Sequence, residues 1–124
     1  MKIYSFKELI VWQKSIDLVC SIYKMTENFP RQEQYGLTSQ MRRSSISIPS
    51  NIAEGRSRST GKEFCRFLAI SDGSAAELET QVEVSFRLKL VSEKEYTDLL
   101  ELVNEIKAML GTMIRKLNPI EKTF

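Results

Sequence analysis

The chain contains no histidine. Histidine is the commonest general base and the commonest metal ligand in proteins, and it activates the nucleophile in Ser-His and Cys-His pairs. Its absence also excludes the Glu-x-x-His pairs that bind di-iron centres inside helical bundles. We therefore expect a protein that is not an enzyme and that binds no metal ion or other cofactor.

Long apolar runs and closely spaced cysteines are also missing. No apolar run approaches the roughly 20 residues that a helix needs to span a bilayer. The N-terminal sequence MKIYSFKELIVW lacks the apolar core and cleavage site of a signal peptide. Cys20 and Cys65 lie far apart and form no CxxC motif. We expect a cytoplasmic protein without a membrane partner, in which both cysteines are buried free thiols.

What the sequence does contain is the apolar spacing of helices. Its 124 residues, 42% hydrophobic and 27% charged, suit a single domain over residues 1–124. Apolar residues recur at helical spacing in four segments, from residue 6 to about 27, from about 32 or 34 to 53, from 61 towards 91, and from 93 to Pro119. No segment shows the alternation of a strand. The short connections predict an all-α, antiparallel, up-down-up-down four-helix bundle.

Three of the four segments begin with a capping box, in which Ser or Thr is followed three residues later by Glu. The hydroxyl of such a box bonds a free backbone N–H of the first turn, and the Glu side chain bonds back to the cap. The sequence therefore predicts helix starts at three pairs: Ser5 with Glu8, Thr60 with Glu63, and Ser92 with Glu95.

The first predicted helix carries two apolar stripes. The first stripe consists of Leu9, Trp12, Ile16, Val19 and Tyr23. The second stripe lies roughly 130° further around the helix and consists of Val11, Leu18, Ile22 and Met25. A helix that is buried on one side needs only one stripe. We therefore expect one stripe to pack inside the subunit and the other to contact a neighbouring subunit.

The second predicted helix contains Pro49, within the stretch SSISIPSNIAEG. A proline in a helix interior removes one backbone donor and crowds the carbonyl four residues earlier, which costs about 3 kcal/mol. The core pattern continues on both sides of it, through Leu37, Met41, Ile48 and Ile52. We expect a second helix that is kinked at the proline. The alternative is a break, with Ser47 capping a separate short helix.

The same helix carries a polar stripe, formed by Gln40, Arg43, Ser47, Ser50 and Glu54, with Asn51 beside it. Short hydrogen-bonding side chains suit a contact between helices better than open solvent. We expect a structural polar seam, within the subunit or between subunits, made by Gln40, Ser47, Asn51 and Glu54. A solvated face and direct contact with a ligand are the alternatives.

Charge is distributed unevenly along the chain. Residues 42–66 include six basic and two acidic residues, whereas residues 72–105 include nine acidic and three basic ones. We expect the basic residues to converge at one helical corner and to bind nucleic-acid phosphates. They are Arg42, Arg43, Arg56, Arg58, Lys62 and Arg66. No aromatic residue interleaves them, so contacts to the backbone are expected rather than to bases. Solvated helix faces are the alternative explanation.

Three segments resemble the four-helix-bundle proteins encoded within 23S rRNA intervening sequences. They are FKELIVWQKSIDLVCSIYKMTENFP, YGLTSQMRRSSISIPSNIAEG and KEFCRFLAISDGSAAELETQ, and they carry the motifs W-x-K, SIP-x-NIAEG and GS-x-x-E in that order. That family is related to the accessory variability determinant of diversity-generating retroelements. This relative has a basic surface that engages nucleic acid and a reverse transcriptase.

The resemblance implies homopentamers around a central axis. It makes the second stripe of the first helix a candidate subunit interface, and it makes Arg42, Arg43, Arg56 and Arg58 candidate RNA or DNA contacts. Nothing in the chain itself indicates a reverse transcriptase partner. Two functions are therefore expected as alternatives. One is an oligomeric bundle that binds RNA or DNA through phosphates. The other is a protein-binding scaffold ring whose basic cluster forms salt bridges between subunits.

Overall fold

The computed structural model describes residues 5–117 of the chain. They form four α-helices, α1 (Ile10–Thr26), α2 (Leu37–Arg56), α3 (Gly61–Arg87) and α4 (Glu93–Leu117), and two short 3-10 helices, η1 (Phe6–Glu8) and η2 (Arg31–Glu33). No strand occurs among these residues. The prediction of an all-α four-helix fold is therefore confirmed. Pro119, expected to end the last helix, lies outside the described residues.

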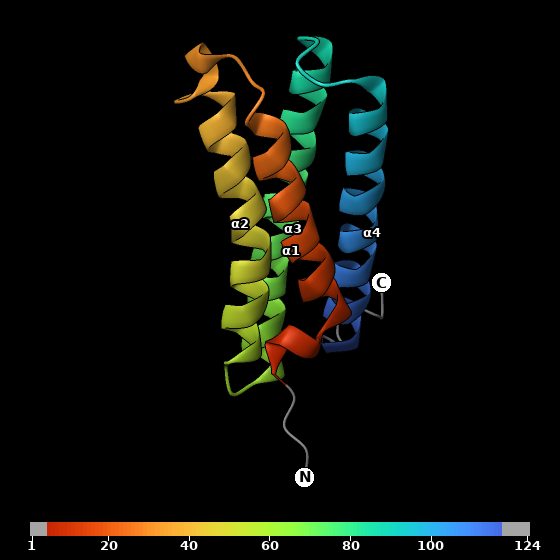
Figure 1. Cartoon of the computed structure of the whole chain (residues 1–124). Coiled ribbons are helices and arrows are strands. Elements are labelled where there is room, and N and C mark those ends of the chain that lie inside the picture. The colour runs from red at the N-terminus through yellow and green to blue at the C-terminus, as the bar shows by residue number, and fades with distance from the viewer. Residues whose placement is uncertain (1–4, 118–124) are drawn as a thin grey trace.

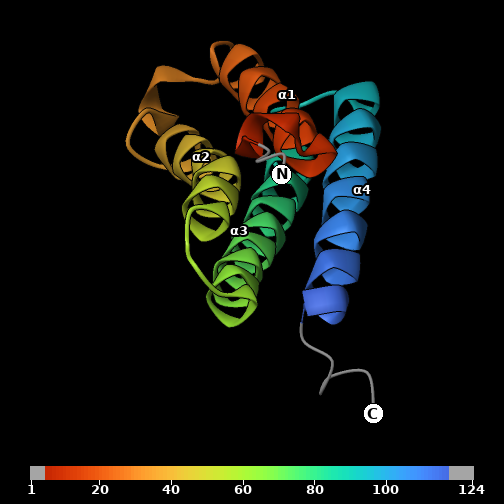
Figure 2. The ribbon, with the colours of Figure 1, turned by 90° about the horizontal axis from the view of Figure 1, so that it is seen from below.

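The four helices lie side by side, and each runs in the opposite direction to the helix before it (Figure 1). The contact between α2 and α3 is the most extensive of the bundle, and the contact between α1 and α4 is smaller than any between consecutive α-helices. Viewed from below, α3 lies between α2 and α4 (Figure 2). The start of α1, the α2–α3 connection and the end of α4 share one end of the bundle (Figure 1), which we call the lower end.

Polar caps determine where two of the long helices begin. Thr60 Oγ1 accepts a hydrogen bond from the Glu63 N–H at 3.1 Å. Ser92 and Glu95 form both bonds of a capping box, at 3.1 and 2.8 Å. The predicted starts at these two boxes are confirmed. Ser5 instead caps η1, because its hydroxyl accepts from the Lys7 N–H, and the prediction of an α-helix directly after Ser5 is wrong.

The second stripe of α1, which we expected at a subunit interface, is part of the core. Its residues are at most 7% exposed: Val11, Leu18, Ile22 and Met25. The first stripe is half-buried from Leu9 to Val19 and exposed at Tyr23, so it lies at the edge of the core. The inward face also carries Ser15 and Thr26, whose hydroxyls donate to carbonyl oxygens of the same helix and can therefore be buried. These two polar residues interrupt the inward stripe and hide its core character in the sequence.

Small polar side chains build the contact between α2 and α3, which we call the α2–α3 seam. Ser47 and Ser74 share a hydrogen bond of 2.8 Å, and the Ser71 hydroxyl donates to the Ile48 carbonyl oxygen at 2.9 Å. Near the lower end, a Cβ atom added to Gly55 would lie only 2.7 Å from the Cβ of a residue on α3, Phe67. The two helices therefore approach each other more closely there than any side chain would allow.

The helix α2 continues through Pro49 from Leu37 to Arg56. The alternative of a break, with Ser47 capping a separate helix, is therefore wrong. Two side chains donate hydrogen bonds to carbonyl oxygens near the proline. Asn51 Nδ2 donates to the Ser47 carbonyl at 2.8 Å, and the Ser71 hydroxyl donates to the Ile48 carbonyl. The bend at Pro49 stays a prediction.

The cysteines only partly follow the expectation from the sequence. Both are free thiols, but Cys65 is buried and Cys20 is exposed on α1. The expected burial therefore holds for Cys65 and is wrong for Cys20. Among the described helices, none is long and apolar enough to cross a membrane.

Candidate nucleic-acid interface

The six basic residues that we expected at one corner lie in two separate places. Arg42 and Arg43 belong to the first half of α2. The other four flank the α2–α3 connection at the lower end: Arg56, Arg58, Lys62 and Arg66. At a rise of 1.5 Å per residue, Arg42 and Arg56 are about 21 Å apart along the helix. The expectation that one corner would contain all six residues is therefore wrong.

Arg42 is bound to the end of α1. Its Nε donates to Thr26 Oγ1 at 2.9 Å, and its Nη2 donates to the Tyr23 carbonyl oxygen at 3.2 Å. Its guanidinium also lies 4.5 Å from the centroid of the Tyr23 ring. The C-terminal end of a helix attracts cations because the helix dipole places partial negative charge on its last carbonyl groups. Arg42 thus joins α1 to α2, whereas its neighbour Arg43 is exposed.

Two arginines at the lower end stack on one aromatic ring. The Cζ atoms of Arg58 and Arg66 lie 4.9 and 4.8 Å from the centroid of the Phe67 ring. Such an arrangement is stabilised by the attraction between a cation and the ring electrons. Phe67 is only 9% exposed, so its ring is not open to a nucleic-acid base. The two arginines can therefore offer cations to phosphates, but the Phe67 ring offers no stacking surface to a base.

Each of the two stacked arginines also has a carboxylate partner. Arg58 Nη2 lies 2.6 Å from Glu54 Oε2, and Arg66 Nε lies 3.5 Å from Glu63 Oε2. The four side chains of these pairs are 43–59% exposed, and ion pairs at such exposure stabilise a protein only weakly. The partners therefore reduce the positive charge of the corner without burying it.

The last turn of α4 adds Arg115 and Lys116, which the sequence reasoning missed. Cys65 Sγ of α3 lies 3.9 Å from the Ile114 carbonyl oxygen, so the end of α4 adjoins the start of α3. The signal was present in the sequence, since an antiparallel bundle brings the last turn of its fourth helix beside the first turn of its third. We call the group of six basic residues at these three places the basic end: Arg56, Arg58, Lys62, Arg66, Arg115 and Lys116.

The predicted polar seam of α2 divides into two parts. Ser47 and Asn51 are half-buried, and they bond each other at 3.0 Å while Ser47 bonds α3. Gln40 and Glu54 are exposed, and Glu54 pairs with Arg58 of its own chain. Of the four predicted residues, Ser47 therefore bonds α3, Asn51 bonds Ser47 within α2, and Glu54 bonds Arg58.

In the acid-rich part of the chain, Glu83 on α3 is a carboxylate with two hydrogen-bond donors, one of them on α4. The Tyr96 hydroxyl of α4 donates to Glu83, and Arg87 Nε donates to it at 2.9 Å. The bond from Tyr96, followed by the bond from Arg87, lowers the pKa of Glu83. The same bond to Glu83 raises the pKa of the Tyr96 hydroxyl above its ordinary value of 10.0. Glu83 is thus held as a carboxylate that links α3 to α4.

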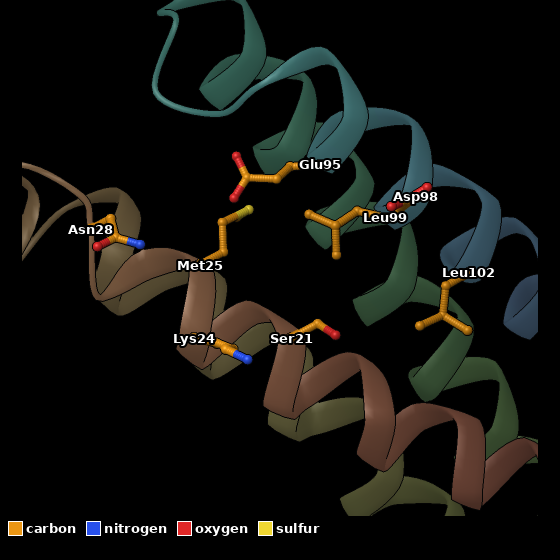
Figure 3. Close-up of a pocket in the computed structure, with 8 residues that line it drawn as sticks. All are labelled: Ser21, Lys24, Met25, Asn28, Glu95, Asp98, Leu99 and Leu102. Atoms are coloured by element: carbon orange, nitrogen blue, oxygen red, sulfur yellow. The ribbon is translucent and has the colours of Figure 1, made fainter.

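A hollow of about 400 Å³ lies between α1 and α4, away from the basic end (Figure 3). Its lining consists of Ser21, Lys24, Met25, Asn28, Glu95, Asp98, Leu99 and Leu102. Both of its carboxylates are engaged, Glu95 with the Ser92 N–H at 2.8 Å and Asp98 with Lys94 at 2.9 Å. Over residues 5–117, no group of His, Cys, Asp and Glu side chains is placed to hold a metal ion. The basic end is therefore the candidate site.

Comparison with known proteins agrees with this fold. Residues 7–112 match the family described as 23S rRNA-intervening sequence protein. A solved structure of a protein with unknown function from the S23 ribosomal protein family, from Bacteroides thetaiotaomicron, is similar with a TM-score of 0.78 and 27% sequence identity, over 86% of this chain and 99% of that one. No curated protein matches the chain. Because the family match extends over most of the sequence, the chain belongs to the 23S rRNA-intervening sequence protein family.

Proposed function

We propose that the protein is a non-enzymatic, oligomeric helical bundle that binds nucleic acid, either RNA or DNA, through phosphate contacts from the basic end. The observation that carries the proposal is the convergence of three chain segments. The end of α2 with the following connection, the start of α3 and the last turn of α4 each contribute two basic side chains. These six side chains outnumber the carboxylates of Glu54 and Glu63 beside them.

Converging cations favour a polyanion, because each phosphate contact releases counterions that had condensed on the nucleic acid. Contacts to phosphates position a protein, whereas contacts to bases specify a sequence. Since the Phe67 ring is covered, we expect binding with little sequence preference. The resemblance to the accessory variability determinant, whose basic surface engages nucleic acid, supports the same proposal.

We also propose that the oligomer forms through the first stripe of α1. A mainly apolar groove between α1 and α2 is lined by Phe6, Trp12, Ile16, Val19, Ile46, Pro49, Ser50 and Ala53. Ile46 is 42% exposed there, and exposed apolar patches commonly mark contacts with other proteins. The second stripe is core, so the first stripe takes the role that the resemblance to homopentamers implied for the second. A neighbouring copy of the chain would then cover this groove.

The test of nucleic-acid binding is a charge reversal at the basic end. We expect the combined variant R56E, R58E, K62E and R66E to lose its affinity for short RNA and DNA duplexes, measured by fluorescence anisotropy. For the wild type, a net release of counterions equal to four phosphate contacts corresponds to a slope of about −3.6 in log K against log salt. Its affinity should then fall about a hundredfold between about 50 and about 200 mM salt.

A matched control reverses four exposed basic residues far from the basic end, K24E, R31E, K89E and K94E. It changes the net charge equally, and we expect it to weaken binding far less. Equal losses in the two variants would show that the basic end is not the site. Unchanged binding in both would contradict the proposed function. A separate R43E variant tests the prediction that Arg43 contacts nucleic acid.

The alternative function, a scaffold ring that binds another protein, predicts a different first effect. In that case the basic cluster forms salt bridges between subunits, and its reversal would dissociate the oligomer before any ligand is added, as measured by light scattering. The pairs of Arg58 and Arg66 with carboxylates of their own subunit would have to open under either function, so the light-scattering result decides between the two. The variant W12E with I16E should dissociate the oligomer under either function, because it places charge in the apolar groove.

A further inference from the structure

The two ion pairs of the basic end have a geometry that suits exchange. Glu54 precedes Arg58 by four residues, and Glu63 precedes Arg66 by three, so each carboxylate is tethered close to its arginine. The Phe67 ring contacts both guanidinium groups independently of the carboxylates. A guanidinium that stacks by its face keeps its N–H donors at the edge of its plane, where an oxygen atom can bind.

We infer that Glu54 and Glu63 are internal counter-ions, which occupy Arg58 and Arg66 in the free protein and are displaced by phosphates when nucleic acid binds. This inference rests on the proposed function and adds a means of regulation to the same site. The two carboxylates compete with the ligand. They therefore set how tightly the basic end binds a phosphodiester backbone and how strongly salt weakens that binding.

A phosphate can replace a carboxylate on an arginine because the two groups bind a guanidinium in the same way. A phosphate presents to a guanidinium the same pair of oxygens as a carboxylate, and both form charge-assisted hydrogen bonds. The arginines can stay on the Phe67 ring while the exposed glutamate side chains turn into solvent. Each released carboxylate then attracts a cation from solution, which offsets one counterion released from the nucleic acid. Each exchanged pair thus makes the salt dependence less steep.

The first experiment removes the competing charge with E54Q and E63Q. An exposed ion pair has a free energy that corresponds to about a twofold to fivefold factor in an equilibrium constant. We expect each substitution to tighten binding to a short RNA duplex by about that factor. The slope of log K against log salt should also become steeper by about one unit for each substitution, since one phosphate contact accounts for about 0.9.

A double-mutant cycle separates direct competition from a general change in charge. In an R58A background, E54Q should no longer tighten binding, whereas E63Q should keep its full effect. In an R66A background the two results should be reversed. The matched control is E101Q, which removes an exposed carboxylate of α4 far from the basic end and should leave affinity and salt slope unchanged. All five substituted side chains are exposed or partly exposed, so the substitutions should not impair folding, which circular dichroism checks.

The outcomes distinguish this inference from the function on which it rests. If the wild-type protein binds neither RNA nor DNA duplexes, both are overturned. If it binds, and E54Q tightens binding equally with and without Arg58, then Glu54 acts on the nucleic acid by long-range electrostatic repulsion. The exchange of partners is then disproved. If it binds and both Glu→Gln variants leave affinity and salt slope unchanged, the carboxylates do not compete, and the proposed function stands without them.

Discussion

The α2–α3 seam and the contact between α1 and α4, the α1–α4 seam, are built in opposite ways. The α2–α3 seam contains bonded serines and a glycine that allows the helices to touch. The α1–α4 seam has hollows of about 400 and about 320 Å³ at its two ends. Between them, Lys14 pairs with Glu105 at 3.0 Å. Glycine and small polar residues that find partners thus let α2 and α3 pack more tightly than α1 and α4.

This difference bears on where the candidate site lies. The basic end depends on the α2–α3 seam, because Gly55 lets Phe67 come close to α2 and the ring then holds two arginines. A precise arrangement of charges needs a rigid support. The α1–α4 seam gives no such support, and its lining carboxylates bond to neighbours on α4 instead.

The strongest way to break the α2–α3 seam is to fill the space at Gly55. We expect Gly55→Ala to destabilise the fold by about 2 kcal/mol, since the new Cβ would meet Phe67 Cβ at 2.7 Å and Phe64 Cδ1 at 2.9 Å. The same substitution at Gly73, where a Cβ meets nothing within 4 Å, should stabilise the helix by about 0.5–1 kcal/mol. Urea unfolding measures both. A neutral or stabilising Gly55→Ala would show that the close approach is not required.

A smaller loss is expected from a serine of the same seam. Ser71 is fully buried, and its hydroxyl bonds the Ile48 carbonyl oxygen of α2, so Ser71→Ala should cost about 1 kcal/mol. Ser21→Ala, which changes a residue lining the hollow of the α1–α4 seam, should stay within about 0.5 kcal/mol of the wild type. Thermal unfolding of the two variants sharpens the comparison. Equal losses of stability in the two variants would contradict the difference in packing between the two seams.

The contact between α3 and α4 gives a third case, which is sensitive to pH. The folded-state pKa of Glu83 is lowered from 4.5 mainly by the Tyr96 hydroxyl. Its contribution to stability is therefore present above pH 4.5 and is lost as the pH falls through the lowered folded-state pKa. Tyr96→Phe should be less stable than the wild type at neutral pH, and its stability should fall less on acidification. Urea titrations along a pH series measure this, and parallel curves for the two proteins would contradict it.

The smallest effect is expected in the α1–α4 seam. Lys14→Met removes an ion pair whose side chains are 33% and 50% exposed, so it should cost about 0.5 kcal/mol or less. The loss should disappear in about 1 M salt, where the Debye length is about 3 Å. Lys94→Met, whose partner Asp98 lies on the same helix, serves as the control. A loss that persists at high salt would mean that the pair fastens α1 to α4 by more than charge.

The sequence predicted the elements that depend on local signals. The capping boxes at Thr60 and Ser92 act within one turn, so pattern alone locates the starts of α3 and α4. The orientation of α1 could not be predicted, because both of its stripes have the right spacing. What decides between them is that Ser15 and Thr26 can satisfy their hydroxyls within the helix, which makes a polar residue acceptable in the core.

The candidate site was only partly predictable for a related reason. Four of its basic residues are close in sequence around the α2–α3 connection, but Arg115 and Lys116 join them only through the packing of α4 against α3. The prediction that Arg42 lies at the same corner was wrong, because this arginine binds the end of another helix, α1. Phe67 has the spacing of a core residue, and nothing in that spacing indicates that two arginines stack on its ring.

The two cysteines differ in exposure, so their rates of chemical labelling can report two different motions of the molecule. Cys20 is exposed on α1 and Cys65 is buried beside α4. A thiol-reactive dye should therefore label Cys20 in a fast phase, and Cys65 only as often as the end of α4 lifts away from α3. If neighbouring copies cover α1, the fast phase should slow as protein concentration rises. The slow phase would report the opening rate of the helices that form the basic end, without any substitution in the chain.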